Sequence, residues 1–210
     1  MRTIDLQSWP RYEQFKKFRY FDYPHFNMCA NVDISIFLPY LKGRGISPTA
    51  AIVYLIARTA NELPEFRCRI HGEGVVEHTV VHPSTTILTT GDLFGFCTVP
   101  YSENFAAFAA DAERRFRAAR EHPSLEDGPG QDDLLFMTAI PWVSFTSFMH
   151  PIHLHPIDSV PRFAWGKFSK QSDRLLMPLS VQAHHALVDG LHVGRYYEKF
   201  QGYLDSPESW

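Results

Sequence analysis

The 210-residue sequence has few cysteines, no apolar run long enough to span a membrane, and no large excess of charge of either sign. Its three cysteines, Cys29, Cys68 and Cys97, are odd in number and lack metal-site spacing, so we interpret them as free thiols in a reducing compartment. A formal net charge of −3 argues against nucleic acid as a partner. The N-terminal residues MRTIDLQSW lack the apolar core of a signal peptide, so we expect a cytoplasmic protein without membrane attachment.

A glycine-rich phosphate loop is also missing, and strand-like and helical segments alternate without a regular βαβ rhythm. These features argue against a Rossmann fold and favour an α/β protein with a mixed sheet and helices packed on it. Seventeen Phe and nine Tyr supply aromatic surface that suits an apolar pocket or a subunit interface as well as a core. The length fits one domain, and we expect it to cover residues 1–210.

Four segments before residue 123 carry helix signals: a short, proline-containing piece around Ile36 to Lys42, and three longer segments. The first of these three has Ser8 as a candidate N-cap and Arg11 close to its start. The second is alanine-rich, and the third is amphipathic with a solvated, arginine-rich outer face. We predict helices that begin at Ser8, at Ser47 and at Ser102–Glu103, the second of them ending at Leu63 before Pro64.

Short apolar or alternating segments bounded by Gly and Pro predict strands. Two of these, Arg162–Phe168 and Leu175–Gln182, should pair across the turn around Lys170 to Ser172. The acidic stretch of residues 123–133 predicts a surface loop. The other predicted strands are Phe26–Ile34, Phe66–Ile70, Val75–Glu77, Thr79–Val81, Thr85–Leu88, Leu93–Val99 and Leu134–Ile140.

Ionisable side chains concentrate where the apolar run Leu175–Val181 gives way to a segment with a helical period. His184, His185 and Asp189 fall within six residues there, and Asp189 can cap the helix. Imidazole is largely neutral yet basic near pH 7, as deprotonation of an alcohol or thiol requires. A hydrogen-bonded core histidine is the commoner explanation of such a pattern, so spacing alone leaves both interpretations open.

The segment DRLLMPLSVQAHHALVDGLHVGR, residues 173–195, resembles the C-terminal signature of the chloramphenicol acetyltransferase family, HHxxxDG preceded by an apolar strand. The stretch MTAIPWVSFTSF, residues 137–148, resembles that family's other fixed block, and SWPRYEQF is similar to its opening. A more distant similarity is to the catalytic domain of dihydrolipoamide acyltransferases. The resemblance implies an α/β two-layer sandwich, a homotrimer, and transfer of acetyl from acetyl-CoA to a hydroxyl of chloramphenicol or a similar small molecule.

The same resemblance assigns catalytic roles. His185 corresponds to the general base, which takes the acceptor's proton and returns it to the CoA thiolate, while His184 is structural. Asp189 pairs with Arg11 and has an architectural role. Thr138 stands where the family usually has a serine that stabilises the oxyanion; it keeps the hydroxyl with a more restricted χ1. The alternative for Thr138 is an ordinary strand residue.

Binding roles follow from the resemblance in the same way. CoA contacts fall on Trp142, Lys167 and Phe168, since a cation and aromatic rings suit a phosphate and an adenine. A surface pair on a strand is the alternative for Lys167 and Phe168. The acceptor-pocket positions are Phe18, Phe94, Phe96, Phe148, His150 and Ala164.

Three of the pocket positions depart from the family pattern. Phe96 is large where the chloramphenicol enzymes have a small residue, His150 replaces an aliphatic side chain, and Ala164 replaces a hydroxyl. A few such contacts can change specificity. An acyltransferase for another metabolite or natural-product hydroxyl is therefore an alternative, as is a non-catalytic trimeric homologue, although an intact base, carboxylate and hydroxyl argue against the latter.

The histidines His150, His153 and His155 also suggest a metal. Intervening prolines and the absence of a nearby cysteine favour a rim or interface loop instead, so we expect no metal. The partners expected are a small hydroxylated substrate, CoA and further copies of the same chain.

Overall fold

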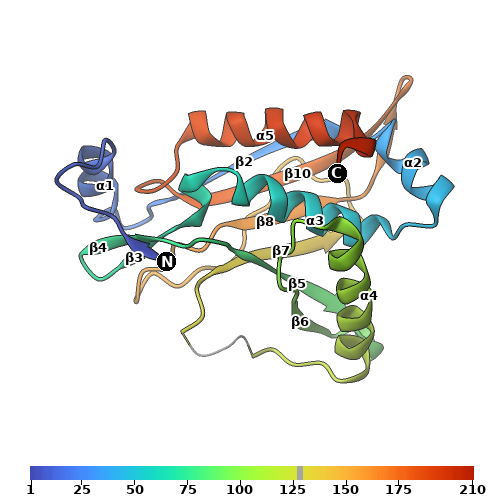
Figure 1. Cartoon of the computed structure of the whole chain (residues 1–210), viewed down its shortest axis with the longest axis horizontal. Coiled ribbons are helices and arrows are strands. Elements are labelled where there is room, and N and C mark those ends of the chain that lie inside the picture. The colour runs from blue at the N-terminus through green and yellow to red at the C-terminus, as the bar shows by residue number, and fades with distance from the viewer. Residues whose placement is uncertain (127–129) are drawn as a thin grey trace.

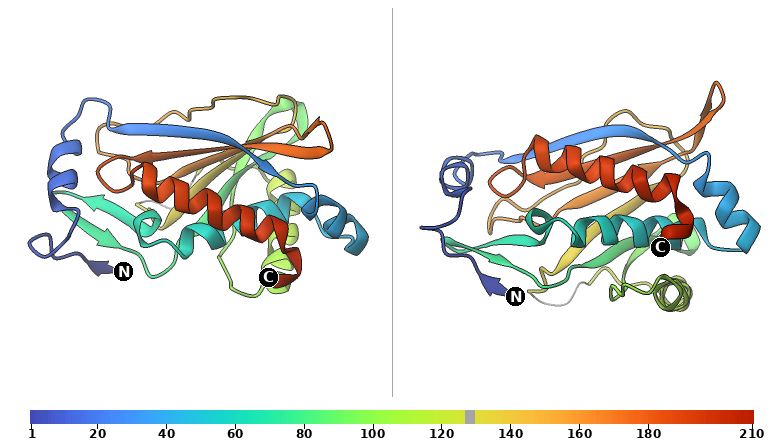
Figure 2. Two further views of the ribbon diagram at one scale, coloured as in Figure 1. Left: turned by 90° about the horizontal axis from the view of Figure 1, so that it is seen from above. Right: turned by 45° about the horizontal axis from the view of Figure 1, so that its top comes forward.

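The computed structural model describes residues 1–126 and 130–210. In that part of the chain a mixed sheet has the order β2-β10-β8-β7-β5-β6, with β9 paired to β10, and a small sheet has the order β1-β4-β3. Helices α3, α4 and α5 pack on one face of the mixed sheet (Figures 1 and 2), so the predicted fold class is confirmed.

The strands are β1 (Arg2–Thr3), β2 (His25–Asp33), β3 (Cys68–His71), β4 (Gly74–Glu77), β5 (His82–Leu88), β6 (Phe94–Thr98), β7 (Leu134–Ile140), β8 (Arg162–Gly166), β9 (Ser169–Gln171) and β10 (Arg174–His184). The helices are α1 (Tyr12–Phe18), α2 (Phe37–Arg44), α3 (Pro48–Asn61), α4 (Phe105–Glu121) and α5 (Gly190–Asp205), with short 3₁₀ turns η1 (Pro64–Arg67), η2 (Thr90–Asp92) and η3 (Pro207–Ser209).

The mixed sheet combines both kinds of pairing. β10 is antiparallel to β2 and to β8, with Leu179 opposite Trp165, so the predicted pairing of these two strands is confirmed. β7 lies parallel to β8 and to β5, and β6 closes the sheet antiparallel to β5. The Thr138-bearing strand therefore lies in the middle of the sheet.

Side chains alternate between the two faces of this sheet, as strand geometry requires. Met177, Leu179 and Val181 of β10 belong to the hydrophobic cluster shared with the helices. The intervening Ser180 and Gln182 point to the opposite face, which we call the outer face. By strand register the outer face also carries His25, Asn27, Thr86, Phe94, Phe96, Thr138, Arg162, Ala164 and His184.

Two helix starts agree with the sequence signals. Ser47 Oγ accepts a hydrogen bond of 3.3 Å from the Ala50 amide, and α3 ends at Asn61, shortly before a proline. Asp189 Oδ1 accepts a hydrogen bond of 3.1 Å from the Leu191 amide at the start of α5. Both segments bury an apolar face, so local capping and tertiary packing favour the same boundaries.

Other sequence predictions were wrong. Ser8 does not cap α1, because its hydroxyl binds the Asp5 carboxylate at 2.9 Å and the helix begins at Tyr12. The third predicted helix begins after Asn104, whose side chain accepts from the Ala107 amide at 2.9 Å. Asn104 thus takes the place of the expected serine at α4, whereas no side chain caps the start of α1.

The predicted strand at residues 79–81 does not form. The Val81 amide donates to the side chain of Asn61 at 2.9 Å, so this segment is held by the end of α3 and not by a neighbouring strand. Residues 127–129 of the predicted acidic loop lie outside the described residues. The described flank of that loop is tied to the sheet by the buried Arg69, which donates to the carbonyls of Asp132 and Leu134 at 2.7 and 2.6 Å.

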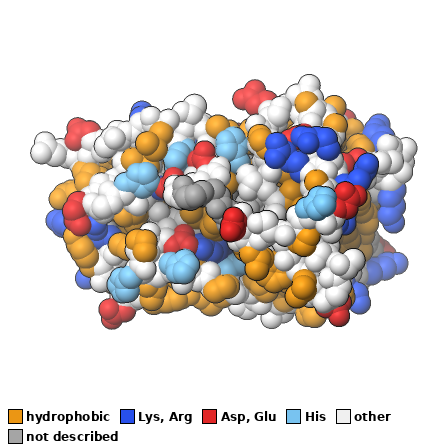
Figure 3. Space-filling model, turned by 90° about the horizontal axis from the view of Figure 1, so that it is seen from below, with side chains coloured by type: hydrophobic (Ala, Val, Ile, Leu, Met, Phe, Trp, Pro, Cys, Tyr) orange, Lys and Arg blue, Asp and Glu red, His pale blue; other side chains and the backbone are white. Residues whose placement is uncertain are grey.

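Figure 3 shows charge of different kinds on the lower surface. Lys and Arg side chains are most concentrated at the right, the α4 end of the molecule, and most of the histidines lie from the middle toward the left. The Asp132 carboxylate binds both His71 and His78, at 2.6 and 3.0 Å. Burial raises the pKa of Asp132, but the hydrogen bonds from His78 and His71 outweigh it and bring the value to about 2.

Candidate active site

The end of β10 delivers His185 to a partly exposed position between α1 and α5. Its ring stacks on Phe18 with centroids 4.0 Å apart and planes 15° from parallel, and Phe26 lies at 5.0 Å. Its main-chain amide donates to the Pro24 carbonyl at 2.8 Å. Rings from α1 and β2 therefore hold the imidazole in one orientation, and the predicted pocket residue Phe18 belongs to the surroundings of the base.

A single hydrogen bond defines the tautomer of His185. Nδ1 lies 3.2 Å from the carbonyl oxygen of Val188. A carbonyl only accepts, so Nδ1 must carry the hydrogen, and Nε2 then has the free lone pair. The described geometry therefore presents a basic nitrogen without help from a carboxylate.

His184 has the opposite environment. It is buried, its Nδ1 accepts from the Ala186 amide at 3.2 Å, and its ring meets His25 edge-on with centroids 4.9 Å apart. Burial, followed by the proximity of His25, lowers the pKa of His184 to about 3, so the ring is neutral at pH 7. Its placement agrees with the structural role expected from the sequence.

Arg11 and Asp189, 178 residues apart in sequence, meet as the sequence predicted. Arg11 Nη1 donates to Asp189 Oδ2 at 2.6 Å, and the side chains are 14% and 30% exposed. Burial raises the pKa of Asp189, but the hydrogen bond from Arg11, the nearby His192 and Arg11 and the hydrogen bond from the Leu191 amide together outweigh it, so the net pKa lies below the usual range. Asp189 Oδ1 also accepts a hydrogen bond from the Leu191 amide, and the Asp189 amide donates to His192 Nδ1 at 3.1 Å. The Asp189 carboxylate therefore stabilises the turn that follows His185.

Thr138 lies on β7 in register with Ala164 of β8. Thr86 Oγ1 is 3.5 Å from Thr138 Oγ1, at the outer limit of a hydrogen bond, and can donate to it. Sequence reasoning missed Thr86, because alternation within a strand does not reveal which residue lies beside it on the next strand. The hydroxyl of Thr138 remains able to donate its own hydrogen elsewhere.

The outer face brings together most of the predicted acceptor residues. Phe94 and Phe96 of β6 have ring centroids 6.0 Å apart, and Phe148 lies in the irregular segment after β7. Ala164 lies next to Thr138, whereas Phe18 lies with His185. One chain therefore places the predicted residues in two groups.

The separation of the two groups follows from strand register. Thr138 aligns with Ala164, and Ala164 aligns with Ser180 on β10. His185 follows Ser180 by five residues, or roughly 17 Å along the strand, and β10 lies about 10 Å from β7. The base and the threonine hydroxyl of one chain are therefore too far apart to act on one substrate.

The predicted CoA residues gather at the far end of β8. The Lys167 amide donates to the Val143 carbonyl at 2.9 Å, which places Lys167 beside the segment that carries Trp142. Trp142 is 63% exposed and Lys167 is exposed, so an aromatic ring and a cation are free to meet a ligand. A Cβ at Gly166 would lie 2.8 Å from the Val143 oxygen, so this close approach requires glycine. No local pattern in the sequence indicates this requirement.

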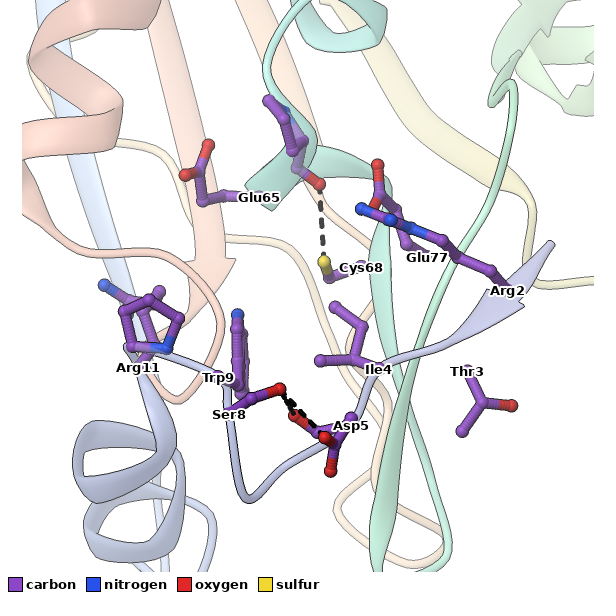
Figure 4. Close-up of a pocket in the computed structure, with 12 residues that line it drawn as sticks. Arg2, Thr3, Ile4, Asp5, Ser8, Trp9, Arg11, Glu65, Cys68 and Glu77 are labelled. Atoms are coloured by element: carbon purple, nitrogen blue, oxygen red, sulfur yellow. Dashed lines mark hydrogen bonds and ion pairs between the residues drawn. The ribbon is translucent and has the colours of Figure 1, made fainter.

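A cavity of about 410 Å³ lies between the N-terminal segment, η1 and the small sheet (Figure 4). Arg11 lies at its edge, Trp9 and Ile4 line it, and Cys68 donates to the Pro64 carbonyl on its wall. Among the described lining residues, Arg11 is the one member of the predicted site. The cavity is therefore separate from the predicted acceptor pocket.

A second cavity of about 540 Å³ is lined by His153, His155 and Asp158 together with Asp132 and Phe136. Across residues 1–126 and 130–210, no group of three or more His, Cys, Asp or Glu has the arrangement of a metal site. In the same part of the chain no helix has the length and apolar character needed to cross a membrane.

Comparison with solved structures identifies the class of protein. A chloramphenicol acetyltransferase structure superposes with a TM-score of 0.86 at 27% identity, over 97% of this chain and 99% of the other. The dihydrolipoamide acetyltransferase of Azotobacter vinelandii shares the fold, with a TM-score of 0.70 at 16% identity over 94% of this chain and 87% of the other. The protein is therefore an acyltransferase.

Sequence comparison narrows this class. The profile of the family described as Chloramphenicol acetyltransferase matches residues 1–201. The chloramphenicol acetyltransferase of Escherichia coli is 32% identical over 206 residues, which cover 97% of this chain and 93% of the relative. That of Bacillus pumilus is 27% identical over 211 residues, covering 100% and 96%. The chain belongs to the chloramphenicol acetyltransferase family.

Proposed function

We propose that this protein transfers an acetyl group from acetyl-CoA to a hydroxyl of chloramphenicol or a similar small molecule, with His185 as general base. The observation that carries the proposal is the hydrogen bond from His185 Nδ1 to the Val188 carbonyl, which makes Nε2 the basic nitrogen of the neutral ring on a partly exposed side chain. Nε2 takes the hydroxyl proton as the acceptor oxygen attacks the thioester carbonyl. The carbon–sulfur bond then breaks, and the same nitrogen returns the proton to the CoA thiolate.

Thr138 supplies the hydrogen bond to the negative charge that develops on the acyl carbonyl oxygen. Thr86 supports this role, because a hydroxyl that accepts from Thr86 is free to direct its own hydrogen at the substrate. Trp142, Lys167 and Phe168 hold CoA, the lysine at a phosphate and the rings against the adenine. The exposed positions of Trp142 and Lys167 fit this use.

Arg11 and Asp189 act by positioning the base, His185. Their ion pair ties the segment before α1 to the turn after His185, and Phe18 at the end of α1 stacks on the base. Removing either partner would leave a partly buried charge without its counter-ion. We infer that the pair keeps the ring of His185 aligned and takes no proton itself.

The active site is completed by a second copy of the chain in a homotrimer. The separation of Thr138 and His185 within one chain supports this, since both must reach the same substrate. His185 and Phe18 of one subunit then face Thr138 and the acceptor residues of its neighbour. Light scattering should report three times 24.2 kDa.

Mixing two inactive variants tests both the base and the shared site. His185→Ala and Thr138→Val are each expected to be nearly inactive in acetyl transfer to chloramphenicol. When the two are unfolded and refolded together, about a quarter of the interfaces should pair an intact His185 with an intact Thr138 and recover about a quarter of the wild-type rate. Recovery of no activity, with trimers formed and each parent variant folded, would contradict a shared site.

The identity of the acceptor is open to a second candidate. Phe96, His150 and Ala164 change the size and polarity of the pocket, which favours another metabolite or natural-product hydroxyl as the natural acceptor. A panel of hydroxyl compounds assayed by release of CoA thiol from acetyl-CoA distinguishes these cases. Inactivity with every acceptor would instead indicate a non-catalytic homologue. The free cysteines and the use of acetyl-CoA fit action in the cytoplasm.

A further inference from the structure

The peptide group between Val188 and Asp189 is hydrogen-bonded at both of its ends. Its carbonyl oxygen accepts from His185 Nδ1 at 3.2 Å, and its N–H donates to His192 Nδ1 at 3.1 Å. A peptide group is planar, so a rotation that moves its N–H also moves its carbonyl. The side chain that holds the N–H therefore also controls the carbonyl that orients the base.

The imidazole of His192 is placed by the start of α5. It is the third residue of that helix, and its side chain closes the capping box with Asp189. Because Nδ1 accepts the amide hydrogen, a neutral ring must carry its own hydrogen on Nε2. That nitrogen lies 3.5 Å from Glu65 Oε1, which is an electrostatic contact at the outer limit of a hydrogen bond.

Glu65 belongs to η1, which packs closely on α5. The next residue, Phe66, is fully buried, and its ring centroid lies 5.1 Å from that of Tyr196, four residues after His192. The side chains of His192 and Glu65 are 8% and 24% exposed. The hydrophobic core therefore holds the carboxylate beside the imidazole, and the contact does not depend on the attraction between the two groups alone.

The surroundings of His192 favour its neutral form. Burial is the largest cause that lowers its pKa, and the charges of Arg11 and Arg195 act in the same direction. Glu65 and Asp189 raise the pKa, but the net value still lies below the usual one. A protonated Nδ1 could only donate, and it would turn to Asp189 Oδ1 at 3.1 Å and release the amide. The neutral ring is thus the form that holds the peptide group in place.

These groups form one series in which every hydrogen points the same way. His185 Nδ1–H donates to the carbonyl, the peptide N–H donates to His192 Nδ1, and His192 Nε2–H faces the Glu65 carboxylate. Hydrogen-bonded groups in such a series polarise one another, so a negative charge at its acceptor end strengthens each earlier bond. The carbonyl is enough to set the tautomer of His185. Glu65 acts from a distance, by making that carbonyl a better acceptor and Nε2 of His185 more basic.

We propose that His192 and Glu65 are positioning residues of the acetyl transfer, which fix this peptide group and raise the basicity of His185 through it. The inference rests on the proposed role of His185 as general base. It assigns to His192 a task that the Arg11–Asp189 ion pair does not perform, because that pair holds the carboxylate of Asp189 and not its amide. The effect is electrostatic, and no proton passes along the series.

Glu65→Gln tests the effect of the charge, because it removes the charge and keeps the size of the side chain. The kcat for acetylation of chloramphenicol should fall about three- to tenfold with little change in KM, since a weaker base slows only the chemical step. The midpoint of the acidic limb of the kcat/KM profile should move to lower pH by about half a unit. A purely structural role would lower the melting temperature without moving this midpoint.

Glu13→Gln is the matched control for the loss of a carboxylate. Glu13 is 73% exposed and pairs with Lys16 on the surface of α1. The rate and the pH profile of this variant should equal those of the wild type. An equal shift of the midpoint in both variants would mean that net charge, and not the position of Glu65, sets the basicity of the base, and it would overturn the inference.

His192→Asn tests whether the charge acts through the imidazole. The amide oxygen of asparagine can take the place of Nδ1 and accept from the Asp189 amide, but the shorter side chain does not reach Glu65. This variant should lose as much activity as Glu65→Gln, and the double variant should lose no more, because the two changes interrupt the same series. Losses that multiply in the double variant would contradict the series. His192→Leu, which leaves the peptide N–H without an acceptor, should be about tenfold slower again.

Chemical modification measures the basicity of His185 without turnover. Diethyl pyrocarbonate reacts with an unprotonated imidazole nitrogen, and the part of the reaction that is missing in His185→Ala belongs to His185. The pH midpoint of that part should be lower in Glu65→Gln than in the wild type, by the same amount as in the rate profile. An unchanged midpoint would overturn this inference alone. Failure of the wild-type protein to acetylate chloramphenicol or any other hydroxyl compound would instead contradict the proposed function.

Discussion

The turn between β10 and α5 and the outer face of the sheet are built in different ways. The turn is held by a few contacts to consecutive residues around His185. These contacts come from Phe18, the Val188 carbonyl and the Arg11–Asp189 ion pair. The outer face carries Thr138 and is contacted by residues 148–150, and its polar side chains come from several strands. A reactive group can thus be oriented by a few contacts around one turn, whereas a binding surface depends on the register of the whole sheet.

The base gives the largest expected effect. His185→Ala should remove nearly all turnover, on the order of a thousandfold, because the variant lacks the basic Nε2 that takes the proton of the acceptor hydroxyl. Circular dichroism and CoA affinity should be unchanged, since the ring is partly exposed. A residual rate above a few per cent would contradict the assignment. His184→Ala, the adjacent control, should act mainly by lowering the melting temperature, because that ring is buried.

The threonine hydroxyl tests the other region. Thr138→Val keeps the shape and removes the donor, so kcat should fall about a hundredfold with little change in either KM. Thr138→Ser should keep or raise the rate, because serine provides the donor with a freer χ1. Steady-state kinetics with both substrates measures this. Equal rates for the valine variant and the wild type would mean that another group holds the oxyanion.

A smaller effect is expected where the segment after β7 crosses β8. Gly166→Ala would place a Cβ 2.8 Å from the Val143 oxygen and 2.7 Å from Pro178 Cγ. The segment with Trp142 would have to move, and overpacking of this kind costs about 1–3 kcal/mol of stability. The KM for acetyl-CoA should rise about tenfold, with a lower midpoint of urea unfolding. Gly194→Ala is the control, because a Cβ at that position would meet no atom within 4 Å beyond the backbone of its own helix.

The buried His184 and the half-buried His150 predict a change in stability with pH. Their folded-state pKa values, about 3 for His184 and about 4 for His150, lie below the unfolded value of about 6.5. The unfolded chain therefore binds more protons below pH 6.5, and stability falls as the pH decreases from there toward 4. Each group contributes a slope of up to about 1.4 kcal/mol per pH unit. Urea unfolding of His150→Leu should show a shallower pH dependence than that of the wild type, and equal slopes would contradict it.

The sequence predicted the structure correctly where functional residues and local folding signals lie in the same segment. A strand, a histidine pair and a capping carboxylate predicted the β10–α5 turn, and Ser47 predicted the start of α3. The prediction failed at Ser8, whose hydroxyl binds the nearby Asp5 carboxylate, and at residues 79–81, where the Val81 amide donates to the more distant Asn61. Local signals predict an element only when no tertiary contact offers its backbone a better partner.

By itself the sequence determined an α/β protein with a mixed sheet, because periodicity and caps are encoded in consecutive residues. Its resemblance to the chloramphenicol acetyltransferase family implied the two-layer sandwich and the residues that carry the motifs. Only the tertiary structure decided that Thr86 lies beside Thr138 and that Gln182 holds the backbone of His150. It also decided that Thr138 and His185 lie far apart in one chain. Strand order and register create these relations, and both depend on how segments distant in sequence share one core.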